Sequence, residues 1–202
     1  MTVRRGCLLC IVVALLLLAP SAARAAGGHY QVEGGTAAER AQITAALNAS
    51  TFDWSIVSAQ IEIHVARGNG SYATPGQIWL DADLLDAGRF SWGVVQHEYA
   101  HQVDFFCLTD ADRAELQPLL GGQAWWGMPT GGLPHAQLTA ERFASTLAWS
   151  YWPSPDNVMR PLKPTDESAT MPPAAFRALM QRLLARPAAN AASAPASHDA
   201  TN

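Results

Sequence analysis

The stretch "WGVVQHEYAHQVDFF", residues 92–106, carries two histidines four residues apart, with a glutamate directly after the first. Apolar residues fill most of the positions around them, which predicts a buried helix across residues 90–106. On a helix, residues four apart lie on the same face, one turn above the other. His97 and His101 can therefore direct two imidazole rings at one point. Glu98 is rotated about 100° from His97 by helical geometry.

Strands are expected before this helix and further helices after it. The alternation of Ile61, Ile63 and Val65 predicts a half-buried strand within residues 56–66, and residues 77–85 are expected to form a strand paired with it. The remaining segments are a short strand in 26–36, a helix at 36–50 with Thr36 as N-cap, turns at 67–76, a loop at 121–134, and helices at 109–120, 136–152 and 172–185. A small sheet followed by helices is the α+β class.

The first 25 residues have the pattern of a signal peptide. Arg4 and Arg5 precede the apolar run 7–19, and Ala23–Ala25 fits a cleavage site. A membrane anchor is the alternative, but the run is shorter than the roughly 20 residues that span a bilayer. We therefore expect a secreted protein whose folded domain covers residues 26–186. The tail, "PAANAASAPASHDATN" at residues 187–202, is expected to be disordered because it lacks apolar residues that could form a core.

Charge and cysteine content restrict the partners and the chemistry. Three of the 13 basic residues fall in the leader, so the mature chain has 17 acidic residues and a net charge of −7. An acidic chain without a basic cluster argues against nucleic acid and anionic membranes as partners. Cys7 and Cys10 leave with the leader, so Cys107 has no partner for a disulfide within one chain. We expect the protein to be a monomer. Cys107 is interpreted as a buried thiol, with a nucleophile as the alternative.

The quoted residues match the H-E-x-x-H pattern of zinc hydrolases, in which the histidines are ligands and the glutamate is the general base. Zinc binds imidazole nitrogen at about 2.0–2.1 Å, and catalytic sites have three protein ligands. The metal lowers the pKa of a bound water towards about 7, so that a nearby carboxylate can take its proton. The pattern predicts a Zn²⁺ site with His97 and His101 as ligands and Glu98 as base. The alternative is a helix with two hydrogen-bonded histidines.

Glu141 is the predicted third ligand. Its helical stripe holds small and apolar residues, and a carboxylate among them needs a partner. The alternative is a glutamate on the surface. Asp104 lies on the stripe of the two histidines but about 10 Å along the axis from His97, at 1.5 Å per residue. We therefore expect Asp104 to orient a ligand histidine from outside the coordination sphere, or else to be a solvated residue near a helix end.

"HEYAHQVD" (residues 97–104), followed by "ERFAST" (residues 141–146), resembles the gluzincin pattern. It is especially similar to the compact metallopeptidases related to the anthrax lethal factor catalytic domain and to the Pro-Pro endopeptidases. The resemblance covers roughly residues 77–150. It implies the same zinc ligands and base, and a zincin-like fold whose edge strand packs on the H-E-x-x-H helix. It also implies that residues 77–85 are that edge strand, along which an extended peptide lies by strand addition.

One position departs from that family. The family has an oxyanion-stabilising tyrosine seven residues before the third ligand, and this chain has Pro134 there. The neighbouring His135 is the candidate that donates this hydrogen bond instead, unless it is a loop residue without a role. Tyr72 and Tyr151 are further candidates.

Two functional hypotheses follow from these residues. The first is a secreted zinc-dependent endopeptidase that acts on a peptide or protein substrate. The second is a non-catalytic secreted protein that is stabilised by zinc and binds a partner through Trp125 and Trp126. A closed site with four protein ligands would favour the second, and an open position would favour the first.

Overall fold

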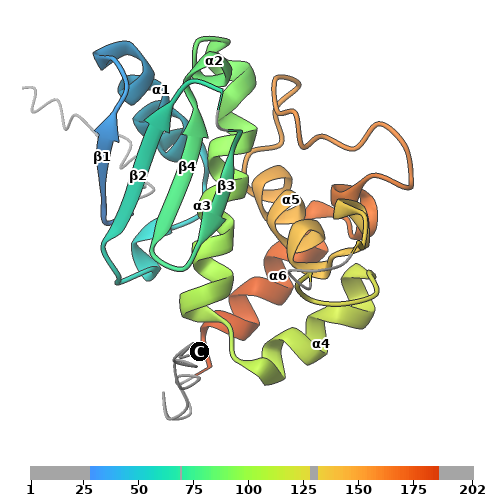
Figure 1. Ribbon diagram of the computed structural model, residues 1–202. Helices are drawn as coiled ribbons and strands as arrows, with labels where there is room; N and C mark the ends of the chain where they lie inside the picture. Colours follow the sequence, from blue (N-terminus) through green and yellow to red (C-terminus); the bar gives the residue numbers. More distant parts are fainter. Residues whose placement is uncertain (1–27, 69, 128–131, 187–202) are drawn as a thin grey trace, which may run out of the picture.

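The computed structural model describes residues 28–68, 70–127 and 132–186 (Figure 1). The predicted leader and the predicted tail lie outside these residues. Strands come first and helices dominate afterwards, so the α+β class is confirmed. The strands are β1 (Tyr30–Gly34), β2 (Ile61–Ala66), β3 (Tyr72–Thr74) and β4 (Gln77–Asp81). The α-helices are α1 (Ala37–Ala49), α2 (Ala82–Leu85), α3 (Trp92–Cys107), α4 (Asp110–Leu120), α5 (Thr139–Tyr151) and α6 (Pro173–Leu184). Short 3-10 helices are η1 (Trp54–Ile56), η2 (Gly88–Ser91), η3 (His135–Gln137) and η4 (Glu167–Thr170).

The sheet has the strand order β1-β2-β4-β3. β1, β2 and β4 are parallel, and β3 is antiparallel to β4. The predicted pairing of the strand in residues 77–85 with the strand in residues 56–66 is confirmed, because β4 pairs with β2. Ile63 and Ile78 are paired across these strands and are almost fully buried. One face of the sheet therefore belongs to the core.

The edge strand was predicted wrongly. β4 lies inside the sheet between β2 and β3, and β3 is the edge strand on that side. β3 falls in residues 67–76, which were expected to be turns only. Its three residues are too few for an alternation to be recognised. The strand also ends before residue 85, because the Asp81 carboxylate accepts a hydrogen bond from the Asp83 backbone N–H (2.9 Å) and caps α2.

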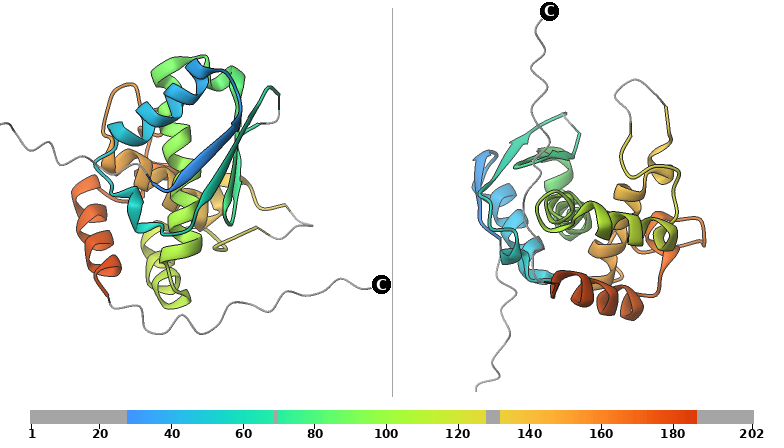
Figure 2. Two further views of the ribbon diagram at one scale, coloured as in Figure 1. Left: turned by 90° about the vertical axis from the view of Figure 1, so that its left-hand side faces the viewer. Right: turned by 90° about the horizontal axis from the view of Figure 1, so that it is seen from below.

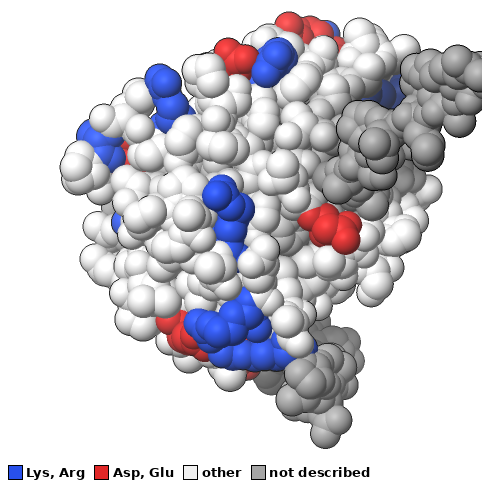
Figure 3. Space-filling view, turned by 180° about the vertical axis from the view of Figure 1, so that it is seen from behind, with Lys and Arg blue, Asp and Glu red and all other residues white. Residues whose placement is uncertain are grey.

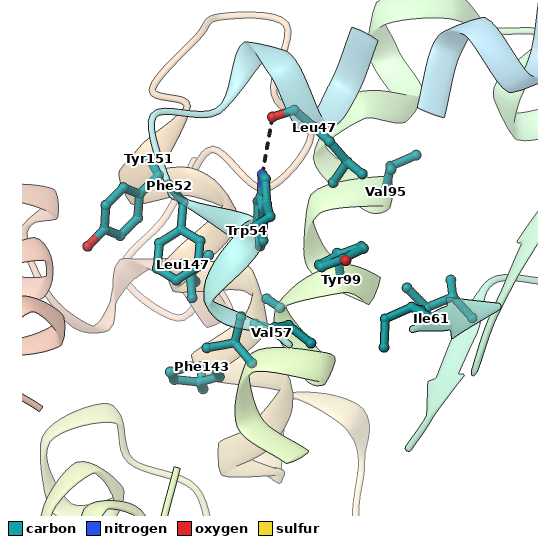
Figure 4. Close-up of a cluster of buried hydrophobic side chains, with 14 of the residues drawn as sticks. Leu47, Phe52, Trp54, Val57, Ile61, Val95, Tyr99, Phe143, Leu147 and Tyr151 are labelled. Carbon is teal, nitrogen blue, oxygen red and sulfur yellow. Dashed lines mark hydrogen bonds between the residues drawn. The ribbon is translucent and has the colours of Figure 1, made fainter. Parts of the chain in front are cut away.

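Helix α3 occupies the middle of the molecule. The two views of Figure 2 place it between the sheet with α1 on one side and α4, α5 and α6 on the other. Trp54, which is fully buried, fills the space between α1 and α3, and its indole N–H donates to the Leu47 carbonyl (3.1 Å; Figure 4). Its ring packs against Tyr99 of α3 and against Phe52. This cluster fixes the helix that carries both histidines.

A buried glutamine joins α3 to the β3–β4 turn. The Gln102 amide donates to the Thr74 carbonyl (2.9 Å) and to the Gln77 carbonyl (3.2 Å), and its oxygen accepts from the Gly76 N–H (2.9 Å). Three backbone groups of the turn are thus satisfied by one side chain that follows His101 in the sequence. The end of β3 is held beside the helical turn that carries this histidine.

Cys107 ends α3 and is half-buried, with its thiol directed at the Ile56 carbonyl. Burial raises the pKa of this thiol to about 11. A thiol acts as a nucleophile only when it is ionised, so the interpretation of Cys107 as a structural residue is favoured.

The surface carries few charges. Figure 3 shows the face behind the view of Figure 1, where the charged side chains stand in small separate groups. Ion pairs of Arg182 and Arg186 with Glu115 join α6 to α4. Within residues 28–68, 70–127 and 132–186, no helix is long and apolar enough to cross a membrane.

Candidate metal centre

Helices α3 and α5 pack against each other and bring three predicted ligands together. The Nε2 atoms of His97 and His101 are 3.2 Å apart. The Oε2 atom of Glu141, in the first turn of α5, lies 3.1 Å from the first and 3.2 Å from the second. Both histidines are buried, and Glu141 is 18% exposed. Two nitrogens and one oxygen thus form a nearly equilateral triangle.

The triangle fits a tetrahedral metal ion. Ligand atoms about 2.0–2.1 Å from a zinc ion are about 3.3–3.4 Å apart at tetrahedral angles. The separations of 3.1–3.2 Å are only slightly shorter. Two imidazoles and one carboxylate are also a donor set that zinc accepts. The residues present therefore fit the metal that the H-E-x-x-H pattern implies.

The tautomer of His97 gives a second reason to expect a bound cation between the three atoms of the triangle. Ser145 Oγ lies 3.1 Å from His97 Nδ1 and 2.8 Å from a Glu167 oxygen. A carboxylate only accepts, so the hydroxyl donates to Glu167 and accepts from the Nδ1–H of His97. In this tautomer Nε2 carries a lone pair, which faces the carboxylate of Glu141 at 3.1 Å. Electron pairs that face one another at this distance repel, and a metal ion among them removes the repulsion.

Ser145 and Glu167 were not predicted as site residues. Ser145 was considered only as a small residue near Glu141. The two are four residues apart on a helix, so they lie on the same face. Glu167 comes from η4, beyond a long connection, and no spacing in the sequence points to it. Partners of this kind fix the tautomer and the orientation of a metal-binding histidine. The Ser145–Glu167 pair occupies the position that was expected for Asp104.

Ser145→Ala should therefore lower zinc affinity by roughly 10- to 100-fold, as changes just outside a coordination sphere typically do. Competition with a chromophoric chelator measures the affinity. Ser150→Ala is the matched control, because Ser150 is a buried serine of the same helix whose hydroxyl has no partner among the described residues. Equal zinc affinities for the two variants would exclude a role for Ser145 in holding His97.

Glu98 lies beside the triangle without belonging to it. Its carboxylate lies within 4.8 Å of the ring nitrogens of His97 and His101. The residue is buried, and burial is the main reason why its pKa is raised, although both histidines oppose the shift. The described residues contribute only burial and charge, and no hydrogen bond, to this shift. A carboxylate with a raised pKa and no protein partner is suited to receive and release a proton.

His135, the candidate for the oxyanion role, lies beside the triangle. It opens η3, and its Nε2 donates to Glu141 Oε2 (2.9 Å) while its Nδ1 donates to Glu167 Oε1 (2.7 Å). Its ring stacks over that of His97 at 6.1 Å. The hydrogen bonds to Glu141 and Glu167 raise its pKa to about 10, so the ring is a cation at neutral pH.

The same hydrogen bonds act on Glu141. Burial alone would raise the pKa of its carboxyl group, but the neighbouring imidazoles of His101, His135 and His97 outweigh burial and hold the pKa far below its usual range. Glu141 is therefore ionised, as a metal ligand must be.

The two tyrosine candidates for the oxyanion role lie elsewhere. Tyr151 is ten residues after Glu141, about 15 Å along the helix at 1.5 Å per residue, and its ring packs against Phe52. Tyr72 lies on β3 and stacks on Trp79 of β4. Of the three candidates, only His135 contacts a ligand residue.

Asp104 has partners other than the predicted histidine. Its carboxylate is fully buried and accepts from Arg113 Nε (2.8 Å), Trp125 Nε1 (2.8 Å) and Trp126 Nε1 (3.1 Å). Helical spacing puts Asp104 on the same stripe of α3 as His101. The direction of its carboxylate is set instead by Arg113 of α4 and by Trp125 and Trp126, which follow α4 in the sequence. The described contacts make Asp104 an anchor for the segment at Trp125.

The segment at Trp125 is also hydrogen-bonded to the start of α5. The Ala140 N–H donates to the Trp125 carbonyl (2.9 Å), one residue before Glu141. Trp125 is itself buried, so the two tryptophans do not form the contact surface that the binding hypothesis assumed. Only Trp126 is exposed, and Arg113 covers its ring at 4.7 Å.

The candidate metal centre therefore consists of a triangle of potential ligand atoms, a buried carboxylate beside it, and a histidine that bridges Glu141 and Glu167. No protein family model matches this sequence, and no curated protein or solved structure is detectably similar to it.

Proposed function

We propose that this chain is an exported zinc-dependent endopeptidase. The observation that carries the proposal is the triangle of His97, His101 and Glu141 with the buried carboxylate of Glu98 next to it. Three ligand atoms and an adjacent base are the composition of a catalytic zinc site. A bound zinc ion would polarise the peptide carbonyl and acidify the attacking water. Export is supported by the leader-like pattern of the first 25 residues.

Glu98 is the proposed general base and acid. Its carboxylate takes a proton from the attacking water and passes it to the leaving amine. Burial serves this role, because a raised pKa makes the carboxylate of Glu98 a stronger base towards the proton of the attacking water.

His135 is the proposed stabiliser of the oxyanion. As a cation it donates charge-assisted hydrogen bonds, which strengthen as negative charge develops on the carbonyl oxygen. Glu167 holds the ring through Nδ1, so the donor at Nε2 stays directed at the centre. This histidine replaces the tyrosine that the resembled family has one position earlier.

A hollow next to the centre offers room for a substrate side chain. It has a volume of about 420 Å³, and its wall includes Ser145 and Glu167, the two residues behind His97. Met159 and Val158 add apolar surface, and Arg160 adds a cation.

The non-catalytic alternative has one observation in its favour. His97, His135 and Glu141 form a second group of potential ligands. If His135 were a fourth ligand, the site would be closed and therefore structural. The alternative is weaker because it leaves the buried carboxylate of Glu98 without a role.

A metal analysis combined with a peptide-library digest tests the proposal. The mature chain should bind one zinc ion and, when loaded, cleave internal peptide bonds that mass spectrometry can map. If the site is open, His135→Ala should keep the zinc and lose cleavage, because none of the three ligand atoms of the triangle belongs to His135. Loss of zinc from His135→Ala, or no cleavage by the fully loaded wild type, would contradict the proposal.

A further inference from the structure

A row of aromatic side chains crosses the outer face of the sheet. The strand register pairs Glu33 with His64, His64 with Trp79, and Trp79 with Tyr72, so the row includes all four strands. The His64 and Trp79 rings are 5.2 Å apart and inclined by 26°. The Trp79 and Tyr72 rings are 4.6 Å apart and almost parallel, at 10°. The rings therefore stack along the direction that runs across the strands.

The two ends of this row differ. At β1 the Glu33 carboxylate lies 3.3 Å from His64 Nδ1 and ends the row. At β3 the last ring is Tyr72, which is 47% exposed. Trp79 covers one face of this ring. The other face points away from β4, over the edge of the sheet, where no described strand lies.

The spacing of the row equals the spacing of strands. Neighbouring strands are about 4.7–4.9 Å apart, and the Tyr72 and Trp79 rings are 4.6 Å apart. In a chain that pairs with β3, the side chain opposite Tyr72 would therefore lie close enough to stack on its ring. Aromatic pairs at directly opposed positions stabilise strand pairing beyond the area that they bury.

The open edge borders the metal centre. Gln102 binds Thr74, the last residue of β3, and follows His101 directly in α3. Figure 1 shows β3 on the side of the sheet that faces α5, the helix of Glu141. A peptide that runs along β3 would therefore pass beside the three ligand atoms.

We propose that a peptide substrate pairs with the edge of β3 and places a Phe, Tyr or Trp side chain against the open face of Tyr72. Tyr72 is then a specificity residue rather than an oxyanion stabiliser. The inference rests on the proposed function, because it names the substrate class of the same site. A second copy of the chain is the less favoured occupant, because a strand of three residues offers little edge for the pairing of two folded chains.

A pair of peptides tests the inference. One is the best substrate found in the library digest, and the other has leucine in place of its aromatic residue at the enriched position. The wild type should prefer the aromatic peptide by roughly 3- to 10-fold in kcat/KM, the size expected for one aromatic pair. Tyr72→Ala should lose this preference and still cleave the leucine peptide, while Tyr72→Phe should keep it.

Phe90→Ala is the matched control, because Phe90 is an exposed aromatic residue of η2 outside the sheet. It should behave as the wild type does. Zinc content and melting temperature are compared first, so that a folding defect in Tyr72→Ala is recognised. An aromatic preference that survives in Tyr72→Ala, or no aromatic enrichment at any position, would overturn the inference. So would a dimer that Tyr72→Ala dissociates in analytical ultracentrifugation.

A binding measurement separates this inference from the proposed function. The zinc-loaded Glu98→Gln variant is applied to an array of hexapeptides, with and without the further change Tyr72→Ala. Retention enriched in aromatic peptides and dependent on Tyr72 supports the inference even if the wild type cleaves nothing. Cleavage by the wild type without such retention rejects the inference and leaves the endopeptidase proposal standing.

Discussion

Glu98→Gln should lower peptide cleavage by at least roughly 10²- to 10⁴-fold, the usual contribution of general acid–base catalysis. Zinc content and melting temperature should stay nearly unchanged. Glutamine keeps the size of the side chain but cannot accept a proton from water. No hydrogen bond to the described residues contributes to the pKa of Glu98, so the substitution breaks no structural bond of this carboxylate. Burial of a neutral amide in place of a carboxylate is also less costly.

The rate comparison uses the zinc-loaded wild type and variant on one library-derived peptide. Glu115→Gln is the matched control, because this residue of α4 forms surface ion pairs with Arg182 and Arg186 and lies outside the centre. Such pairs contribute little to stability, so cleavage should be unchanged. If Glu98→Gln cleaves as fast as the wild type, Glu98 is not the base, even if the activity itself is real.

The centre could be predicted from the sequence as far as it depends on local geometry. His97, Glu98 and His101 lie within two turns of one helix, so their spacing fixes their relative placement. Glu141 was recognisable because a carboxylate on an apolar stripe needs a compensating partner. His135 was found only through its position relative to Glu141, as a substitute for a tyrosine.

The parts that failed depend on the order and contacts of elements distant in the sequence. The alternation in residues 61–65 identifies β2. An alternation within one strand does not predict the order of strands, so the position of β3 outside β4 could not be inferred from it. The partners of Asp104 come from α4 and from the segment at Trp125, so a helical stripe could not specify them. The Ser145–Glu167 bond joins α5 to η4 across a connection without regular structure.

Glu141→Ala should lower zinc affinity more than Asp104→Ala, and Asp104→Ala should lower stability more than Glu141→Ala. Glu141→Ala removes one of the three triangle atoms, so zinc affinity should fall by more than the roughly 10- to 100-fold that outer changes cause. Asp104 forms its hydrogen bonds with Arg113 and two indoles, and none with His101. We therefore expect Asp104→Ala to lower zinc affinity by less than about 10-fold, which is below the effect expected from its place on the histidine stripe.

In the metal-free proteins, the melting temperature should fall more for Asp104→Ala than for Glu141→Ala, the reverse of their order in loss of zinc affinity. Asp104→Ala leaves Arg113, which is only 13% exposed, without its buried partner. Breaking a buried ion pair by removing one partner costs about 3–5 kcal/mol, or on the order of 10 °C in melting temperature for a chain of this size. Glu141→Ala removes a carboxylate whose partners are imidazoles, which can be neutral, so we expect it to cost less stability than the loss of a partner of Arg113.

Chelator competition and thermal melting of the metal-free proteins measure the two quantities independently. A variant that loses zinc but melts normally has lost a ligand, and a variant that melts early but keeps its zinc has lost an anchor. Glu141 should be the first kind and Asp104 the second. If Asp104→Ala loses the metal while Glu141→Ala binds it as the wild type does, the triangle of His97, His101 and Glu141 is not the metal site, because its oxygen would then be dispensable.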